Sequence, residues 1–479
     1  MGSAILTPSE TVRPLCVDLD GTLIKSDSLY DAFCELLRRN PLQALQAPFW
    51  VLGGKARLKA EVAQRSQLDP ARLPYNAQLL RYLEDQHRDG RPIYLATGAA
   101  VPLAERVAAH LGFFSGVLGT EGKTNLTSEN KLSRLKTQFG EFDYIGNSTA
   151  DLKVLAGARE ALIANPTRGL RRGLRRKKIA IAGEFIDRRP TARTLVKAMR
   201  VHQWTKNVLL FAPLLLSHKL NGGSINAVLI AFLCFSFMAS ASYLVNDMLD
   251  IESDRHHVSK RLRPFAAGDL SVMGGAALAV GLFVASIALL PLLPKAFALW
   301  LGLYIAVTTS YSFYLKRIAI LDVLLLSGLY TLRLLAGGAA TGTEISQWLA
   351  GFSSFLFLSL AMVKRFSEIE TLREKGGTAT NGRGYLVTDL EQIRSFGTAS
   401  AYAAVVVFML YIGRPDVTQL YRHAMRLWLI VPLLIYWLNR VWLLASRGEL
   451  DDDPVVFAMR DPMSLAVGAA VAAIALLAT

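Results

Sequence analysis

Three aspartates and an asparagine stand close together at spacings that suit metal binding. They lie in residues 246–254, whose sequence is NDMLDIESD. At about 100° of rotation per residue, Asp247, Asp250 and Asp254 fall on one face of a helix, with Asn246 at its margin. Three carboxylates on one face repel one another unless a cation lies among them, and Mg²⁺ takes carboxylate and phosphate oxygens. The pattern therefore predicts a Mg²⁺ site suited to a bound diphosphate.

Basic residues follow this acidic stretch and recur at the ends of later apolar segments. In HHVSKRLRP, residues 256–264, Lys260 and Arg263 are candidates for binding phosphate oxygens that a metal leaves uncovered. The other candidate cations are Lys206, Lys364 and Arg365. The alternative for several of these residues is ordinary charge on cytoplasmic loops. The two histidines lack a third ligand at metal-binding spacing, so they are predicted to be surface residues.

A lone acid follows a tyrosine and a lysine further along the chain. In YSFYLKRIAILD, residues 311–322, the acid is Asp322, and no residue four positions away from it is acidic. Tyr311 and Lys316 precede it in the same segment. The segment therefore lacks a second pair of metal-binding carboxylates. Together with the surplus of cations, this indicates a site for two phosphorylated substrates.

A further group of candidate residues follows short apolar strands near the N-terminus. Asp18 and Asp20, in DLDGT, come directly after the apolar run 15–17, and two later apolar runs end in ATG and YIG. Helical segments lie between these strands, which predicts a doubly wound parallel sheet in an α/β domain. Residues 29–73 interrupt the alternation and are expected to form a small helical cap.

Long apolar runs dominate the rest of the chain. The 479 residues are 52% hydrophobic with a mean hydropathy of +0.31, which is too apolar for a soluble enzyme of this size. A membrane span needs roughly 20 mostly apolar residues. The predicted all-α membrane domain has nine spans, near residues 205–220, 225–246, 272–291, 294–312, 319–340, 345–363, 397–413, 425–445 and 461–478. Basic loops follow the even-numbered spans, so these loops are expected to face the cytoplasm.

The protein is expected to be a multi-pass protein of a bacterial inner membrane. The net charge of +15 fits cytoplasmic loops, so no nucleic-acid partner is predicted. The three cysteines show no paired or metal-type spacing. Residues 1–13 lack the hydrophobic core of a signal peptide, so the α/β domain is expected to stay in the cytoplasm.

Three regions are predicted along the chain. The α/β domain covers residues 1–167, a basic linker covers 168–192, and the membrane domain covers 193–479. The linker contains RGLRRGLRRKK, which is expected to contact anionic lipid headgroups.

The membrane part carries a resemblance to a known superfamily. Residues 246–268, NDMLDIESDRHHVSKRLRPFAAG, resemble the first Asp-rich motif of the UbiA-type prenyltransferases, and the likeness extends over residues 193–479. It implies an all-helical bundle with its active site at the cytoplasmic end and a side opening for a lipid tail. Aromatic prenyltransferases of this superfamily usually carry paired aspartates in a second motif. Here the corresponding segment has Asp322 alone.

Four segments together resemble one branch, the polyprenyl-phosphate phosphoribosyltransferases. They are QWTKN, NDMLDIESDRHHVSKRLRP, YSFYLKRIAILD and MVKRFSE. The resemblance implies 5-phosphoribosyl diphosphate as donor and a polyprenyl phosphate as acceptor, with diphosphate leaving on Mg²⁺. Asp322 is then predicted to hold a ribose hydroxyl or complete the metal site, and Tyr311 and Lys316 to hold the donor's 5-phosphate.

The N-terminal motifs resemble the haloacid-dehalogenase phosphatase superfamily. The resemblance implies that Asp18 is the nucleophile, Asp20 the acid/base, Thr97 a ligand of the phosphoryl group and Lys131 its neutralising cation. In GNSTAD the first metal-binding acid is replaced by an asparagine, and the two metal-ligand positions are Asn147 and Asp151. An amide oxygen still binds Mg²⁺ but brings no charge. The fusion predicts removal of the product's 5-phosphate; the alternative is an inactive scaffold.

Two other functions compete with this prediction. An aromatic polyprenyltransferase would hold a prenyl diphosphate on the Asp-rich face. A transporter or lipid-binding membrane protein would need the spans but not the acidic face. The expected partners are the two substrates and membrane lipids, and the sequence leaves a homo-oligomer open.

Overall fold

The computed structural model describes residues 13–121, 125–187, 191–217, 221–374, 376–378, 383–450 and 453–479. The chain forms two compact units. The first unit comprises residues 1–199 and 243–279, and the second comprises residues 200–242 and 280–479. The Asp-rich segment therefore belongs to the same unit as the N-terminal domain.

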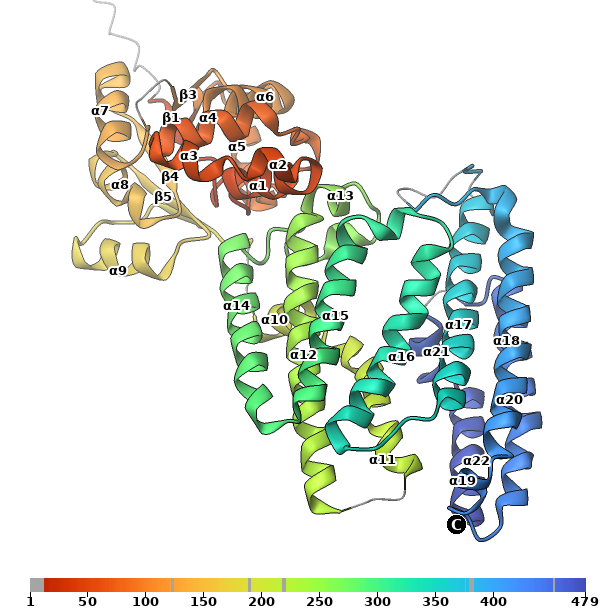
Figure 1. Cartoon of the computed structure of the whole chain (residues 1–479). Coiled ribbons are helices and arrows are strands. Elements are labelled where there is room, and N and C mark those ends of the chain that lie inside the picture. The colour runs from red at the N-terminus through yellow and green to blue at the C-terminus, as the bar shows by residue number, and fades with distance from the viewer. Residues whose placement is uncertain are drawn as a thin grey trace, which may run out of the picture. The chain divides into compact units, whose positions relative to one another are not determined.

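A parallel sheet of six strands forms the centre of the first unit, in the order β3-β2-β1-β4-β5-β6 (Figure 1). β1 is completely buried and pairs with β2 on one side and with β4 on the other. The strand order reverses between β1 and β4, and ligands of α/β sheets bind at the carboxyl ends of strands at such a point. The strands are β1 (Leu15–Val17), β2 (Ile93–Ala100), β3 (Gly116–Thr120), β4 (Asp143–Gly146), β5 (Ala161–Ala164) and β6 (Gly183–Phe185).

Helices cover both faces of this sheet. Leu15 and Val17 pack with side chains of α5 and α6, whereas Cys16 packs with side chains of α7, α8 and α9 on the other face. Successive side chains of a strand point to opposite faces, so a strand of three apolar residues serves both layers. The predicted doubly wound α/β fold is confirmed. The helices are α5 (Ala77–Arg88), α6 (Val101–Leu111), α7 (Ser128–Phe139), α8 (Leu152–Gly157) and α9 (Arg168–Arg176).

The predicted helical cap lies between β1 and β2 in the chain. Its own small core includes Leu36, Trp50 and Val62. The first cap helix begins where the Asp27 carboxylate accepts hydrogen bonds from the backbone N–H groups of Leu29 and Tyr30, as N-cap aspartates do. The cap helices are α1 (Ser28–Arg39), α2 (Pro41–Ala44), α3 (Ala47–Leu52) and α4 (Lys55–Arg65).

Part of the segment predicted to be a basic linker is instead built into the α/β domain. Leu170 and Leu174 of α9 are buried against the sheet, and β6 pairs with β5 through Glu184 and Ile163. The two leucines stand four residues apart, so they share one helical face while the arginines around them stay on the others. This apolar face explains why the segment does not behave as a free linker.

The Asp-rich segment is helical across a short break. α12 (Gly222–Leu249) ends before Asp250, and α13 (Ile251–Arg255) follows. The backbone N–H of Asp250 donates to the Asn246 carbonyl at 2.9 Å, and that of Asp254 donates to the Asp250 carbonyl at 2.7 Å. These i to i−4 bonds keep the helical spacing of the acids through the break.

Seven helices of the described residues are long and apolar enough to cross a membrane. The spans cover Gly222–Leu249, Val272–Leu292, Lys295–Phe313, Leu321–Thr341, Gln347–Glu374, Val387–Ile412 and Ala424–Ser446. Their main helices are α12, α14 (Val272–Leu289), α15 (Lys295–Phe313), α16 (Leu321–Thr341), α17 (Gln347–Glu374), α18 (Leu390–Ile412) and α20 (Ile430–Ser446).

Two of the nine predicted spans are not among these seven helices. The region predicted as the first contains a 3₁₀ helix, η3 (Val201–Phe211), and α11 (Ala212–Leu216), with Pro213 at the junction. Proline lacks an N–H group and interrupts regular helical bonding, so hydropathy alone overestimated this helix. The last is α22 (Pro462–Ala478), which is apolar but only 17 residues long. The remaining short helices are α10 (Ala192–Ala198), α19 (Pro415–Thr418) and α21 (Pro454–Ala458).

Candidate active sites

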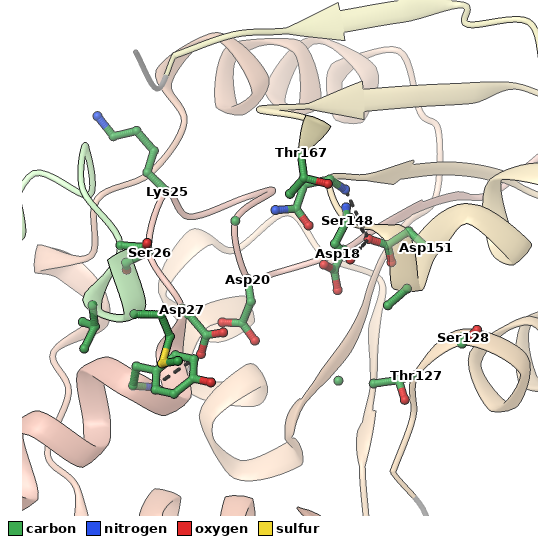
Figure 2. A pocket seen from close by; sticks show the side chains of 18 of the residues that line it. Asp18, Asp20, Lys25, Ser26, Asp27, Thr127, Ser128, Ser148, Asp151 and Thr167 are labelled. Atoms are coloured by element: carbon green, nitrogen blue, oxygen red, sulfur yellow. Dashed lines mark hydrogen bonds between the residues drawn. The ribbon is translucent and has the colours of Figure 1, made fainter. Parts of the chain in front are cut away.

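The predicted acids of the α/β domain meet at the carboxyl ends of β1 and β4 (Figure 2). Lys131 reaches over from α7, and its Nζ lies 2.8 Å from Asp18 Oδ1 and 3.5 Å from Asp151 Oδ1. The Tyr144 hydroxyl accepts a hydrogen bond from Lys131 Nζ at 2.8 Å and donates one to Asp151 Oδ1 at 2.8 Å. Three predicted site residues are thus brought together, with Tyr144 as an unpredicted partner.

A cavity of about 410 Å³ opens beside these residues. Asp18, Asp20, Lys131, Asn147 and Asp151 all line it. The Asp20 carboxylate is fixed by the backbone N–H of Ser28, which donates to Asp20 Oδ1 at 2.7 Å. The cavity therefore has two acids and a cation around one space, the groups that phosphoryl transfer requires.

Thr97 is predicted to hold a phosphoryl oxygen, and this role stays a prediction. Its side chain is completely buried and its Oγ1 accepts a hydrogen bond from the Ala99 N–H at 3.0 Å. The cavity lining includes the next residue, Gly98, rather than Thr97. A phosphoryl group in this cavity would therefore meet the backbone of Gly98 before it met the Thr97 hydroxyl.

Burial changes the protonation of the two acids. Burial raises the pKa of Asp18 to about 7, although Lys131 acts in the opposite direction. Burial and the neighbouring Asp27 raise the pKa of Asp20 to about 7. For Asp151 burial also acts upward, but Lys131 and the hydrogen bonds from Ser148 outweigh it and lower the pKa. Asp20 can therefore exchange a proton near neutral pH, which suits a general acid/base.

The donors around the cavity fit Mg²⁺ only with help from a substrate. The two oxygens of Asp151 already accept hydrogen bonds from Tyr144 and from Ser148. Within the described ranges no group of three His, Cys, Asp or Glu side chains is arranged to hold a metal ion. Mg²⁺ is commonly bound by one or two carboxylates plus phosphate and water oxygens. Asp18 and the Asn147 amide supply donors of this kind.

The Asp-rich segment also gathers its acids around a cation. Arg263 Nη1 lies 3.2 Å from Asp247 Oδ1 and 2.8 Å from Asp254 Oδ2. Asp247 and Asp254 are buried, and burial raises the pKa of Asp254 while Arg263 opposes the rise. Asp250 instead forms an ion pair with Arg38 of α1. The guanidinium thus balances two of the three predicted metal ligands. Within the described residues these acids do not form a group of three that is arranged to hold a metal ion, so the metal site stays a prediction.

A buried ion pair ties this segment to the cap within the first unit. Arg255 Nη2 lies 2.7 Å from Asp31 Oδ2, and both side chains are almost completely buried. Arg255 Nε also donates to the Ala266 carbonyl at 3.2 Å. Neither Asp31 nor Arg255 was predicted, because their partners are more than two hundred positions apart in the chain.

In the second unit Asp322 is held by protein partners. Its Oδ2 lies 2.7 Å from Arg365 Nη2, and both side chains have 0% exposure. The Tyr385 hydroxyl donates to Asp322 Oδ1 and accepts a hydrogen bond from the Ile320 N–H at 2.8 Å. Arg365 also pairs with Glu368. Arg365 was predicted to bind substrate, yet in this geometry it is fully buried against Asp322.

Two other predicted cations, Lys206 and Lys364, converge on an acid that was not predicted. Each lysine Nζ lies 2.9 Å from Asp453 Oδ2. Burial acts to raise the pKa of Asp453, but the two lysines outweigh it and hold this pKa well below the usual range. Asp453 also caps α21, because its Oδ1 accepts the Val455 N–H at 3.2 Å. The sequence signal that could have identified Asp453 is an aspartate followed by proline before a short apolar stretch, which is typical of a helix N-cap.

The remaining predicted residues have less defined surroundings. Tyr311 lies close enough to Arg365 to interact with it. Lys316 and Lys260 are partly exposed, each in a 3₁₀ turn.

Asp322→Ala is expected to destabilise the protein by about 3–5 kcal/mol, because it leaves the Arg365 charge buried without its partner. Thermal and denaturant unfolding in detergent would measure the loss. Glu391→Ala is the matched control, since Glu391 pairs with Arg394 on an exposed surface and should change stability little. Equal losses of stability in the two variants would show that the buried ion pair contributes no more to stability than the exposed one.

Comparison with known proteins identifies both parts of the chain. The family model described as "UbiA prenyltransferase family" matches residues 208–476. The model described as "haloacid dehalogenase-like hydrolase" matches residues 15–156. The "Uncharacterized protein y4nM" of Sinorhizobium fredii is 38% identical over 96% of this chain and 90% of its own length. The similarity to this relative therefore covers both parts.

Other relatives match the membrane part. "Nodulation protein NoeC" of Azorhizobium caulinodans is 32% identical over 57% of this chain and 89% of its own length. "Decaprenyl-phosphate phosphoribosyltransferase" of Corynebacterium glutamicum is 40% identical over 45% of this chain and 66% of its own length. The chain is therefore a multi-pass member of the UbiA prenyltransferase family that carries an N-terminal haloacid dehalogenase-like domain.

Proposed function

We propose that the membrane part transfers a 5-phosphoribosyl group from 5-phosphoribosyl diphosphate to a polyprenyl phosphate and releases diphosphate. The observation that carries this proposal is the state of Asp322. It is the acid of the segment where a second metal site would be expected, and both of its oxygens are engaged by Arg365 and Tyr385. Lys206 and Lys364 converge on Asp453 in the same unit, which favours phosphate groups on both substrates.

The transfer requires one bond to form and one to break. A phosphate oxygen of the lipid attacks the anomeric carbon of the ribose, and the bond from that carbon to the diphosphate oxygen breaks. The attacking oxygen is already anionic, so no general base is needed. Asp247, Asp250 and Asp254 would hold Mg²⁺, which when bound neutralises charge on the leaving diphosphate. Arg263, now between two of these acids, is positioned to contact the diphosphate as well.

The α/β domain is proposed to remove the 5-phosphate from the lipid product. Asp18 attacks the phosphorus and forms an aspartyl phosphate, while Asp20 gives a proton to the departing ribose oxygen. Water then attacks the same phosphorus, Asp20 takes its proton, and phosphate leaves. Lys131 holds Asp18 in place and balances the charge on the phosphoryl oxygens. The alternative of an inactive scaffold is favoured by Asn147, which brings no negative charge to the metal position.

This function places both reactions at the cytoplasmic side of a bacterial inner membrane. A diphosphate-release assay on detergent-purified protein tests the transfer. Release should require Mg²⁺, 5-phosphoribosyl diphosphate and polyprenyl phosphate together. Release from a prenyl diphosphate mixed with an aromatic acid would favour an aromatic prenyltransferase instead.

Lys316→Ala is expected to raise the KM for 5-phosphoribosyl diphosphate about tenfold, because it removes a cation proposed to hold the 5-phosphate. Steady-state kinetics with each substrate varied in turn would measure the change, and the KM for the lipid should stay the same. Lys295→Ala is the control. Lys295 is an exposed lysine at the first residue of α15, whereas Lys316 follows the last residue of this helix. An unchanged donor KM in Lys316→Ala would remove this residue from the site.

A further inference from the structure

Among the described residues of the second unit, two lysines share a single acid. Lys206 comes from η3, Lys364 from α17 and Asp453 from the segment before α21. Both lysine Nζ atoms lie 2.9 Å from the same oxygen, Asp453 Oδ2. All three side chains retain some exposure, between 13% and 33%. A single carboxylate therefore holds two ammonium groups at a place that a solute can reach.

A third cation, Arg333, lies close to the same tyrosine ring as Lys206. Arg333 of α16 is 5% exposed, and in the described part of the chain no carboxylate lies within ion-pair distance of it. Its Nε donates to Asn207 Oδ1 at 2.9 Å and its Nη1 to the Leu329 carbonyl at 2.6 Å. Buried polar groups are normally paired, and an arginine within a membrane helix usually marks a functional site.

Tyr330 lies close to both Arg333 and Lys206. The Arg333 guanidinium carbon is 5.7 Å from the centre of its ring, and Lys206 Nζ is 5.6 Å from the same centre. The Tyr330 hydroxyl donates to Asp453 Oδ1 at 3.5 Å. Among the described residues, the charged groups of Lys206, Lys364, Arg333 and Asp453 therefore form one cluster with three positive charges and one negative charge. An anion of charge near −2 would balance it.

Aromatic side chains add an apolar wall to this cluster. Arg333 also lies over the rings of Phe235 and Tyr304, at 5.4 and 5.1 Å from their centres. Tyr330 stacks on Phe357, with ring centres 4.5 Å apart. A phosphate monoester carries the required charge.

We propose that Lys206 and Lys364 bind the phosphate of the lipid acceptor, and that Asp453 is an internal counter-ion which this phosphate displaces. The inference rests on the proposed function and names the acceptor's site within it. Arg333 supplies the third positive charge from behind. On displacement Asp453 keeps its hydrogen bond from the Val455 N–H, so α21 keeps its N-cap.

The test is equilibrium binding of a polyprenyl phosphate to the full-length protein in detergent, without donor and without Mg²⁺. Asp453→Asn keeps a side chain that caps helices well and removes the competing charge. It should tighten polyprenyl phosphate binding about tenfold, which corresponds to about 1.4 kcal/mol. Lys206→Ala and Lys364→Ala should each weaken binding. Asp453→Ser, which also caps helices, repeats the test should the first variant fold poorly.

The chain offers a matched control for this variant. Asp461 also precedes a proline, caps α22 and pairs with a cation, Arg440. Asp461→Asn should leave lipid binding unchanged. Equal or weaker binding in both Asp453 variants would overturn the counter-ion role. Tightening seen with 5-phosphoribosyl diphosphate or inorganic phosphate, but not with polyprenyl phosphate, would overturn the assignment to the lipid.

Binding and turnover separate this inference from the proposed function. Suppose that the variants change lipid binding as expected but that no ribosylated product forms. This result would contradict the proposed transfer and would still support the phosphate site. A ribosylated product with lipid binding indifferent to Asp453, Lys206 and Lys364 would contradict only the site.

Discussion

Asp247→Asn is expected to lower the rate of lipid phosphoribosylation by at least about a hundredfold and to raise the Mg²⁺ concentration needed for half-maximal rate. The reason is the loss of one of the two buried carboxylates that Arg263 now bridges. The amide keeps the size of the side chain but supplies no charge to a metal. Initial rates measured over a range of Mg²⁺ concentrations would show both effects.

Asp269→Asn is the control for this prediction. Asp269 also belongs to residues 243–279 of the first unit, but it lies outside the Asp-rich face. Its Oδ1 lies 3.9 Å from Lys25 Nζ. Its substitution should leave both the rate and the Mg²⁺ requirement near those of the wild type. An Asp247→Asn variant that behaved like this control would show that the Asp-rich face does not hold the metal.

Asp18→Asn is expected to abolish phosphate release by the α/β domain, with a loss of about 10⁴-fold or more, because the nucleophile is removed. The isosteric amide still fits beside Lys131 and Thr22, so the domain should stay folded. Phosphate release from phosphoribosylated lipid would be followed in the full-length protein. Transfer of the phosphoribosyl group itself should continue, so the 5-phosphorylated lipid should accumulate.

The surface pair Asp85 and Arg88 provides the control for this second prediction. Asp85→Asn changes the same functional group on an exposed helix of the same domain and should leave phosphate release intact. Absence of phosphate release in the wild-type protein itself would favour the scaffold role that Asn147 suggests. Release that survived in Asp18→Asn would exclude Asp18 as the nucleophile.

The parts of the fold that follow from local patterns could be predicted from the sequence. Alternating apolar strands and helices predicted the doubly wound sheet, and apolar length predicted most of the spans. The prediction of a free linker differs from the structure at α9, which packs against the sheet. The spacing of Leu170 and Leu174 in the sequence already indicates an apolar helical face. The first span failed because hydropathy does not register the 3₁₀ geometry of η3 or the effect of Pro213.

The candidate sites were predictable only in part, because the missing residues act through distant partners. Asp453 pairs with Lys206 across 247 positions, and Tyr385 reaches Asp322 across 63. The residues next to Asp453 in the sequence do not indicate that it pairs with Lys206 and Lys364. For the same reason the sequence predicts Arg365 to bind substrate and gives no sign of its buried pair with Asp322. Residue type predicted the chemistry of each site, whereas the pairing of charges depended on the tertiary fold.

Mass spectrometry of the lipids formed from polyprenyl phosphate and 5-phosphoribosyl diphosphate tests the proposed reaction most directly. The detergent-purified protein with Mg²⁺ should yield a lipid heavier by one phosphoribosyl group, and Asp247→Asn should not. A second lipid lacking one phosphate should appear with the wild type and disappear with Asp18→Asn. Unchanged polyprenyl phosphate, together with turnover of a prenyl diphosphate and an aromatic acid, would contradict the proposed function.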